Sequence, residues 1–421
     1  MRKRLLALTM MSALTVTAFA GCGSDKSNTQ KPAGNAASAE NPQAVSLKLW
    51  TSEEDYELTE DMCARFDEAH PEYKCDFEIT IINVDESVEQ LETDPDNAAD
   101  VFIMPSGSIP QLVEEGLVYP ITYDADTLKG LYSEGALDAC SMNGELYGVP
   151  FTPNSWFMFY NKKLFNAEEV KSLETMMAKD LGDDTYNFSC SLSNSWYIEA
   201  WFYAAGCTLF GEDGTTPDDC TWNNANGLAA GEYIIDLVNN PKYIEDKDGV
   251  AGSLMKEGKL GAICTGTWGY PELLEALGDD LGAVALPTVE IAGKTANLSN
   301  FADYKCFAVK SNTSAPLAAQ QLAEFFANEE NQLLRYQKNS TPPTALSLTD
   351  NADIMSDIST CALLAQTEFA TPQPAISQIN AYWTPAEALG TGIVNGEITK
   401  ANLQESLDSL VESVTTKAFE Q

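Results

Sequence analysis

Histidine is almost absent from this 421-residue sequence, in which His70 is the only one. His70 lies at the predicted C-terminal end of a helix, beside Pro71. A histidine is favoured at that end by the helix dipole, and this is a better explanation of His70 than membership of a nucleophilic triad. The sequence also lacks G-x-S-x-G and G-x-x-x-x-G-K-[ST], and no G-x-G-x-x-G follows a strand. These absences argue against a serine hydrolase, a P-loop nucleotidase and a dinucleotide-binding enzyme. A glycosidase stays open, because 63 acidic residues guarantee pairs of carboxylates.

Metal-ligand patterns are also scarce. The ten cysteines form no C-x-x-C motif, and with a single histidine they predict neither a metal site nor a cofactor. Cys22 belongs to the N-terminal signal, and the remaining number is odd, so at least one thiol is free or paired with another chain. Cys207 and Cys220 flank a turn-rich segment that could bring them together as a disulfide. Alternatively, most of these cysteines are small buried apolar residues, and the sequence leaves both interpretations open.

Basic residues are few: 24 Lys and Arg stand against 63 Asp and Glu, for a formal net charge of −39. Nucleic-acid binding needs a basic footprint, so no nucleic-acid partner is expected. The excess of acidic residues is better explained by a soluble surface than by an anionic ligand.

Long apolar runs are missing beyond the N-terminus, so no later segment is predicted to span a membrane. The first residues, MRKRLLALTMMSALTVTAFAGC, have a basic head, a short apolar run and small residues before Cys22, which is typical of an export signal. The stretch FAGC resembles a bacterial lipoprotein signal. This implies removal of residues 1–21, a lipid anchor on Cys22 and a location at the extracellular face of the cell membrane. A plain secretory peptide is the alternative. Residues 22–44 are expected to form a flexible tether.

The remaining body, about 380 residues, is long enough for two lobes. Strands predicted over 45–50, 74–82 and 100–105 alternate with helices over 57–70, 84–93 and 109–116. The same alternation returns over 260–310, and from Pro316 the sequence is mostly helical, over 317–327, 330–338 and 401–419. The pattern predicts two α/β lobes with largely parallel sheets and a helical C-terminal end.

Residues 148–165, GVPFTPNSWFMFYNKKLF, are the densest aromatic segment. Trp156, Met158 and Tyr160 alternate with Phe157 and Phe159, which predicts a strand buried on both faces with the two phenylalanines in the core. Two prolines precede Asn154 and Ser155 and fix the chain direction. This arrangement predicts a crossing point between lobes, with polar groups free for a ligand.

Several tryptophans lie at the ends of predicted elements, among them Trp50, Trp268 and Trp383. Ligands of open α/β sheets bind beyond the carboxyl ends of strands, where an indole can lie flat against a sugar. A stacked ring face covering about 60 Å² contributes on the order of 1.5 kcal/mol. For each tryptophan, an ordinary core position is the alternative.

Five segments resemble, in order, the maltose-binding group of the extracellular solute-binding proteins of ABC importers. They are ADVFIMPSGSIPQLVEEGLVYPI (99–121), NGELYGVPFTPNSWFMFYNKKLF (143–165), GAICTGTWGY (261–270), LGAVALPTV (281–289) and INAYWTPAEALGTGIVNGEIT (379–399). The resemblance covers the body from Val45 to Ala418. It implies a two-lobe periplasmic-binding-protein-like fold, hinged by three crossings near Thr152, Asp303 and Thr341. The N-terminal lobe would comprise 45–152 plus 303–341, and the C-terminal lobe 153–302 plus 342–421.

The resemblance also implies the site. The expected ligand contacts are Glu53, Glu54 and Asp55 after the first strand, Asn154 and Trp156 at the crossing, Ser195, Trp196 and Tyr197 in one segment, and the stacking residues Trp268 and Trp383. Lys305 is a further candidate at a crossing. The sequence departs from the family pattern in several places, and one of them is Ser195, which stands where the family has a glutamate. Asn154 replaces an acidic residue, Gly107 and Ser108 replace an Asp-Arg pair, and Met104 replaces a tryptophan.

The implied function is that of a non-enzymatic, monomeric receptor that captures an oligosaccharide, a maltooligosaccharide above all, and delivers it to an ABC permease. One alternative keeps the fold and changes the ligand, either to another oligosaccharide or to a cationic solute such as a polyamine, held by Glu53, Glu54 and Asp55. Two alternatives of other classes are a surface glycosidase and a structural adhesin.

Overall fold

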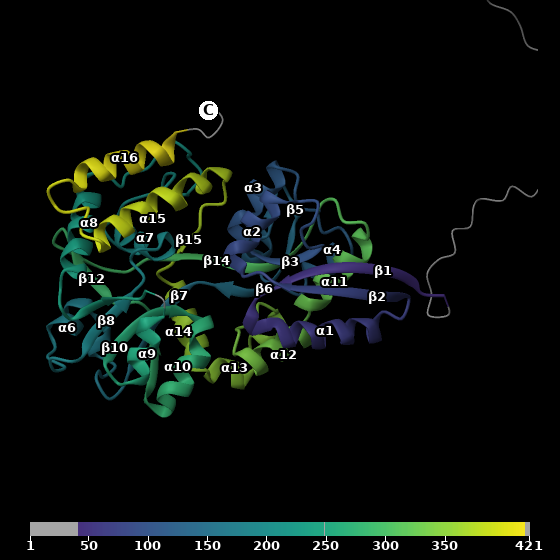
Figure 1. Ribbon diagram of the computed structural model, residues 1–421, viewed down its shortest axis with the longest axis horizontal. Helices are drawn as coiled ribbons and strands as arrows, with labels where there is room; N and C mark the ends of the chain where they lie inside the picture. Colours follow the sequence, from purple (N-terminus) through teal and green to yellow (C-terminus); the bar gives the residue numbers. More distant parts are fainter. Residues whose placement is uncertain (1–40, 248, 417–421) are drawn as a thin grey trace, which may run out of the picture.

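Two separate β-sheets organise the chain, one in each of two lobes (Figure 1). The computed structural model describes residues 41–247 and 249–416; the expected signal peptide, Cys22 and most of the expected tether lie outside these residues. Within the described part, no helix is both long and apolar enough to cross a membrane.

The sheet of the N-terminal lobe has the order β15-β14-β3-β1-β2, with β6 also paired to β14. Its strands are β1 (Gln43–Thr51), β2 (Tyr73–Ile81), β3 (Val101–Pro105), β6 (Gly148–Asn154), β14 (Phe301–Val309) and β15 (Thr371–Pro372). β1 is parallel to β2 and β3, whereas β14 is antiparallel to β3 and β6. The helices before the crossing are α1 (Tyr56–Ala69), α2 (Val84–Thr93), α3 (Ile109–Glu114), α4 (Ala125–Leu128) and α5 (Glu134–Ala139); α11 (Pro316–Ala327) and α12 (Glu329–Asn339) follow β14.

The sheet of the C-terminal lobe has the order β11-β7-β10-β8-β9. Its strands are β7 (Trp156–Asn161), β8 (Tyr186–Cys190), β9 (Tyr243–Glu245), β10 (Leu260–Gly266) and β11 (Leu281–Val284). The helices of this part are α6 (Leu173–Ala178), α7 (Ser195–Ala204), α8 (Ala225–Val238), α9 (Val250–Lys256), α10 (Tyr270–Leu277), α14 (Ile358–Thr367), α15 (Asn380–Val394) and α16 (Leu403–Thr415). Two small hairpins, β4 (Ser141–Met142) with β5 (Glu145–Leu146) and β12 (Thr288–Ile291) with β13 (Lys294–Asn297), and α13 (Ala352–Ser356) complete the regular elements apart from short 3₁₀ turns.

The expected alternation of strands and helices is confirmed. Leu58, Met62 and Phe66 form the buried stripe of α1, and β1 extends the first predicted strand to Gln43. The crossing strand is buried on both faces, as expected. Trp156 and Met158 enter the core shared by α7, α8, α15 and α16, whereas Phe157 enters the separate core around α10 and α14.

The two crossing strands β6 and β14 connect the lobes through buried polar contacts. Asn300 has no exposed surface, and its side-chain amide donates to the Ser155 hydroxyl over 2.9 Å and to the Trp156 carbonyl over 2.6 Å. The Ser155 hydroxyl in turn donates to the Phe301 carbonyl over 2.9 Å. The point at which the chain leaves one lobe is therefore fixed by side chains rather than by apolar packing alone.

The nine cysteines of the described residues are all free thiols, and only Cys361 is exposed. Cys220 pairs across a short bridge with Leu209, and Cys207 is not its backbone partner. Cys207 and Cys220 therefore form no disulfide and are small buried residues, the second of the two interpretations that the sequence left open. Burial raises the pKa of each to about 12, which suppresses the reactive thiolate.

Candidate functional site

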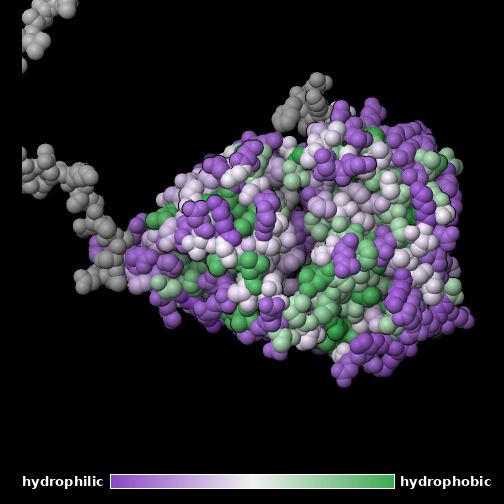
Figure 2. Space-filling model, turned by 180° about the vertical axis from the view of Figure 1, so that it is seen from behind, coloured by the Kyte–Doolittle hydropathy of each residue, from purple (hydrophilic) through white to green (hydrophobic). Residues whose placement is uncertain are grey.

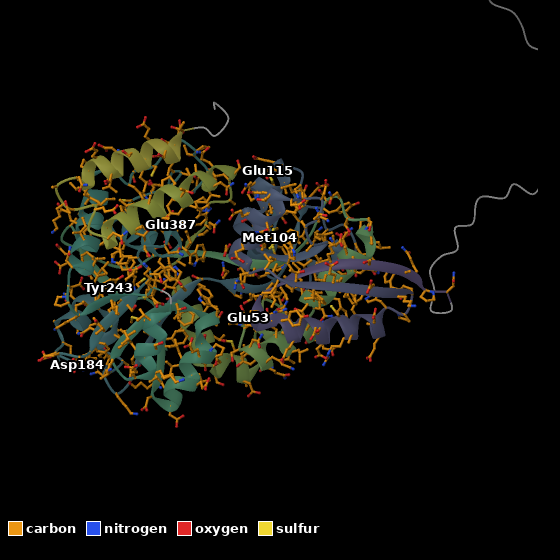
Figure 3. The ribbon with its side chains drawn as sticks, in the orientation of Figure 1. Glu53, Met104, Glu115, Asp184, Tyr243 and Glu387 are labelled. Atoms are coloured by element: carbon orange, nitrogen blue, oxygen red, sulfur yellow. The ribbon has the colours of Figure 1, made fainter. Side chains whose placement is uncertain are left out.

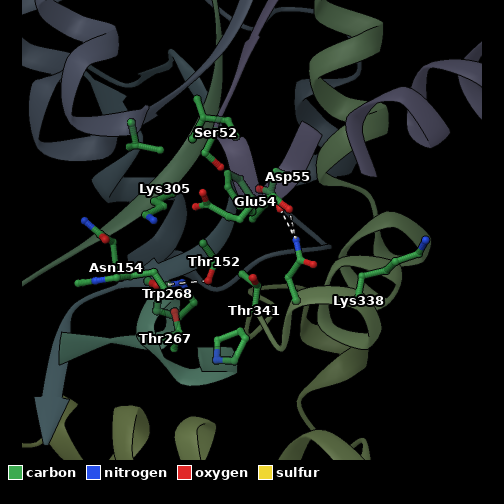
Figure 4. Close-up of a pocket in the computed structure, with 16 residues that line it drawn as sticks. Ser52, Glu54, Asp55, Thr152, Asn154, Thr267, Trp268, Lys305, Lys338 and Thr341 are labelled. Carbon is green, nitrogen blue, oxygen red and sulfur yellow. Dashed lines mark hydrogen bonds between the residues drawn. The ribbon is translucent and has the colours of Figure 1, made fainter. Parts of the chain in front are cut away.

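A cavity of about 170 Å³ lies between the lobes, where the crossing strands pass from one to the other (Figure 4). Figure 2 shows the seam between the lobes on the opposite face from Figure 1. The residues that line the cavity come from both lobes: Ser52, Glu54, Asp55, Val84, Ile103, Phe151, Thr152, Pro153, Asn154, Thr267, Trp268, Pro271, Lys305, Lys338, Asn339 and Thr341. Ligand sites usually measure ~300–1,000 Å³. The lobes or the lining side chains must therefore move before the cavity can hold a chain of sugar units.

Trp268 is the aromatic surface of the cavity. It lies in the 3₁₀ turn Thr267–Gly269, directly after β10, and 41% of its surface is exposed. Gly266 makes this position possible, because a Cβ atom there would stand 2.0 Å from a ring atom of Trp268. Trp268 is thus held at the carboxyl end of a buried strand, as the sequence predicts, with much of its ring free to contact a ligand.

The N-terminal lobe contributes the turn Glu53–Asp55, which follows β1. Glu54 is exposed and lines the cavity, whereas Glu53 is exposed near the junction of the lobes and is not among the lining residues (Figure 3). Asp55 is buried, and its carboxylate accepts hydrogen bonds from Arg335 and, over 2.5 Å, from Asn339. Of the three expected acidic contacts, Glu54 alone presents an exposed carboxylate to the cavity.

Arg335 forms a buried ion pair with Asp55. The arginine is 1% exposed, and its guanidinium lies 4.7 Å from the ring centre of Phe151 and 5.6 Å from that of Phe307. The planar cation is therefore stacked on the rings while it pairs with Asp55. This contact connects α12 to the turn after β1 and shapes one wall of the cavity.

The hinge contributes Asn154 and Asp303, which are register partners in the ladder between β6 and β14. The Asn154 amide donates to Asp303 over 2.5 Å, and the Gly107 backbone N–H donates to the other carboxylate oxygen over 3.4 Å. Burial raises the pKa of the Asp303 carboxyl from its ordinary 3.8 to about 7, and these two hydrogen bonds oppose the rise.

A second group of aromatic residues lies in the C-terminal lobe. The ring of Trp383 is 6.2 Å from Trp196, 6.1 Å from Phe301 and 5.1 Å from Tyr382. Ser195 is buried, and its carbonyl accepts a hydrogen bond from the Tyr382 hydroxyl over 2.8 Å. Trp383 and Trp196 are half-buried, so each keeps a part of its surface at the edge of this group.

Trp156 and Tyr197 form a third aromatic contact, with ring centres 4.8 Å apart. Trp156 has no exposed surface, and its indole N–H donates to the Trp196 carbonyl over 3.0 Å. Trp156 therefore packs against the N-terminal part of α7, on which Tyr197 is half-buried.

Sequence reasoning thus places Glu54, Asp55, Asn154 and Trp268 in one cavity, where the structure also finds them. The structure does not bring the other expected contacts Trp156, Ser195, Trp196, Tyr197 and Trp383 into that cavity. Of the departures from the family pattern, Met104 is fully buried and Gly107 lies against the Gln373 side chain. The sequence does not predict the contributions of Arg335, Lys338 and Asn339 on α12. A helical pattern does not show which of its polar residues will face a cavity formed with distant segments of the chain.

Two hinged α/β lobes that share a cavity lined by apolar and hydrogen-bonding side chains, with one exposed tryptophan, define a receptor for a small solute. The comparisons with known proteins lead to the same class. The chain matches the model of the bacterial extracellular solute-binding proteins over residues 61–360, and it therefore belongs to that family.

Curated relatives and solved structures cover most of the chain. A galactooligosaccharide-binding protein of Bacillus subtilis is 28% identical over 420 residues, or 96% of this chain and 95% of that protein. A maltooligosaccharide ABC transporter solute-binding lipoprotein of Streptococcus pneumoniae is 26% identical over 348 residues, or 78% of this chain and 79% of that protein. A structure solved with acarbose superimposes with a TM-score of 0.83 at 28% identity over 88% of this chain and 99% of that one. MalX of Streptococcus pneumoniae, solved with maltopentaose, has a TM-score of 0.75 at 21% identity over 87% of this chain and 99% of that one, which supports the fold.

Proposed function

We propose that this chain is a lipid-anchored, non-enzymatic receptor that captures an oligosaccharide between its lobes and delivers it to an ABC permease. It would act as a monomer at the extracellular face of the cell membrane. The observation that carries the proposal is the exposed ring of Trp268, set among hydrogen-bonding groups from both lobes. An indole face with amide and carboxylate groups around it matches a sugar ring, which has apolar faces and a rim of hydroxyls.

Ligand-driven closure would couple capture to delivery. The cavity draws Glu54 from the N-terminal lobe and Trp268 from the C-terminal lobe, so a sugar that contacts both binds the closed arrangement better than an open one. The crossing strands β6 and β14 supply the hinge about which the lobes would move.

A maltooligosaccharide is the ligand that we put first, because the resemblance to the maltose-binding group runs along the whole body. A galactooligosaccharide is the second candidate, favoured by the 28% identity with the galactooligosaccharide-binding protein of Bacillus subtilis. Both are neutral chains of hexoses, and they differ in how the hydroxyls around Trp268 would be paired.

A thermal-shift panel tests the proposal. Maltose, maltotriose, maltopentaose, galactobiose, spermidine and a monosaccharide control would each be added at millimolar concentration. A ligand at a hundred times its Kd stabilises the folded protein by about 2.7 kcal/mol, enough to raise the melting temperature by a few degrees. If none of the oligosaccharides raises it, the receptor assignment fails. Chromatography of the sugars after prolonged incubation should show no hydrolysis products; their appearance would favour the glycosidase.

A further inference from the structure

Lys305 occupies an unusual place in the cavity. It lies on β14 two residues after Asp303, and its ammonium stands 5.3 Å from the centre of the Trp268 ring (Figure 4). β14 belongs to the sheet of the N-terminal lobe and Trp268 follows a strand of the other sheet, so this contact joins the two lobes. An ammonium over an indole face is attracted to the ring electrons, and the more so when water is excluded.

The Lys305 ammonium finds no hydrogen-bond acceptor and no ion-pair partner among residues 41–247 and 249–416. Two of the nearby carboxylates are already engaged. Asp55 accepts from Arg335 and Asn339, and Asp303 accepts from Asn154 and Gly107. Burial lowers the pKa of Lys305, while Asp55, Glu54 and Asp303 act in the opposite direction. The side chain is thus a half-buried cation whose three N–H donors are not taken up by a protein acceptor of the described residues and are available to a ligand in the cavity.

We propose that Lys305 sets the ligand selectivity of this cleft: its ammonium donates to an oxygen of the sugar unit beside Trp268 and keeps cationic solutes off that ring. The inference deepens the proposed function and rests on it. A neutral sugar brings hydroxyl and ring oxygens as acceptors for the ammonium, and its hydroxyls can donate to Glu54. A polyamine would need the acidic groups and an aromatic face, but Lys305 already holds the cation position on Trp268 and repels a second positive charge.

The chain offers a matched control. Lys294, the first residue of β13, is exposed and is not among the residues that line the cavity. Lys305→Met and Lys294→Met therefore make the same change of charge and length at two positions, only one of which lies in the cavity and touches the indole. Lys305→Arg keeps the positive charge, and Lys305→Gln removes it with a polar group in its place.

Calorimetric titration of the full-length protein and its variants with maltotriose, galactobiose and spermidine tests the inference. Wild-type protein should bind a sugar and not spermidine. Lys305→Met should weaken sugar binding at least tenfold, about 1.4 kcal/mol, and should gain measurable spermidine binding, while Lys294→Met stays within threefold of wild type for sugar. Lys305→Arg should still exclude spermidine. Circular dichroism verifies folding, and Lys305→Gln replaces Lys305→Met if the latter does not fold.

The outcomes separate the two proposals. If wild-type protein binds a sugar but the charge-removing variant at 305 remains within threefold of it, or if wild-type protein binds spermidine as tightly as sugar, Lys305 does not set the selectivity. If wild-type protein binds none of the sugars, the proposed function fails. In that case the titrations with spermidine still test whether Lys305 excludes cations. If spermidine does not bind the variant that lacks the charge at position 305, the inference is overturned.

Discussion

The side-chain amide of Asn154 donates to the carboxylate of Asp303 over 2.5 Å and so connects the two strands that pass between the lobes. Asp303 is 7% exposed, and the Gly107 N–H, on the turn after β3, reaches its second oxygen. The hinge therefore contains a carboxylate that is hydrogen-bonded yet largely desolvated. Its pKa, raised to about 7 by burial, makes the hinge sensitive to pH near neutrality.

The first prediction concerns pH and stability. Because the folded-state pKa of Asp303 lies above its ordinary value, the folded state holds the proton more tightly than the unfolded state. This contribution to stability is complete below about pH 4 and is lost as the pH rises through about 7. Asp303→Asn removes the titration while keeping an acceptor for Asn154. From pH 5 to pH 8.5, wild type should lose about 1–3 kcal/mol more of its free energy of unfolding than the variant loses.

Urea unfolding at the two pH values measures this difference. Other titrating groups, such as Glu324, whose pKa burial raises to about 8, affect wild type and variant alike and cancel in the comparison. Asp218→Asn, a change at an exposed aspartate, is the control and should follow wild type. Equal pH dependence of wild type and Asp303→Asn would show that the hinge carboxyl does not titrate in this range.

The second prediction separates the two tryptophans of the expected site. Trp268→Ala should weaken sugar binding more than tenfold while changing stability by less than about 1 kcal/mol, because much of the ring is exposed. Trp383 lies outside the cavity, but the resemblance to the maltose-binding group assigns it a stacking role, so Trp383→Ala should also weaken binding more than tenfold. It should in addition cost about 1–3 kcal/mol of stability through its contacts with Trp196 and Phe301. Titration calorimetry and urea unfolding of both variants give the two numbers. Unchanged titration curves for both would count against the sugar-binding assignment.

The third prediction tests the support of Trp268. In Gly266→Ala, the added methyl group would overlap the indole ring, so the ring must move from its place in the cavity. We expect sugar affinity to fall at least tenfold, although the mutated residue itself is not a ligand contact. Gly135→Ala, where a Cβ would meet nothing within 4 Å, is the control. Tryptophan fluorescence reports the movement of the ring, and an unshifted spectrum with unchanged affinity would contradict the prediction.

The fourth prediction concerns Arg335. Arg335→Met removes a buried cation that pairs with Asp55 and stacks on Phe151 and Phe307. Breaking such a pair leaves Asp55 with a buried, undercompensated charge, so we expect a loss of about 3–5 kcal/mol in the free energy of unfolding. Adding Asp55→Asn should restore part of this loss, because the remaining group is then neutral. Urea unfolding of the single and double variants measures the coupling, and additive effects would show that the two side chains act independently.

Much of this architecture follows from local pattern. The alternation around Trp156 predicts a strand with two buried faces. The position of Trp268 could also be predicted, because it directly follows the carboxyl end of a buried strand, where ligands of α/β sheets bind. Orientation within a turn is harder to predict. Glu53, Glu54 and Asp55 are consecutive, yet one is exposed away from the cavity, one lines it and one is engaged by an arginine about 280 residues later in the chain. Long-range pairing of this kind depends on the packing of α12 on the sheet, which no local window contains.

The distribution of thiols gives an experimental handle on lobe movement. Cys361 is the one exposed cysteine of the described residues and lies on α14, in the lobe that carries Trp268. Among the thiols of the described residues, a maleimide fluorophore should react there first, because the others are buried or half-buried and burial raises the pKa of Cys75, Cys207 and Cys220 to about 12. Paired with a second dye on a cysteine introduced in α1, this native position would report the distance between the lobes as a ligand enters.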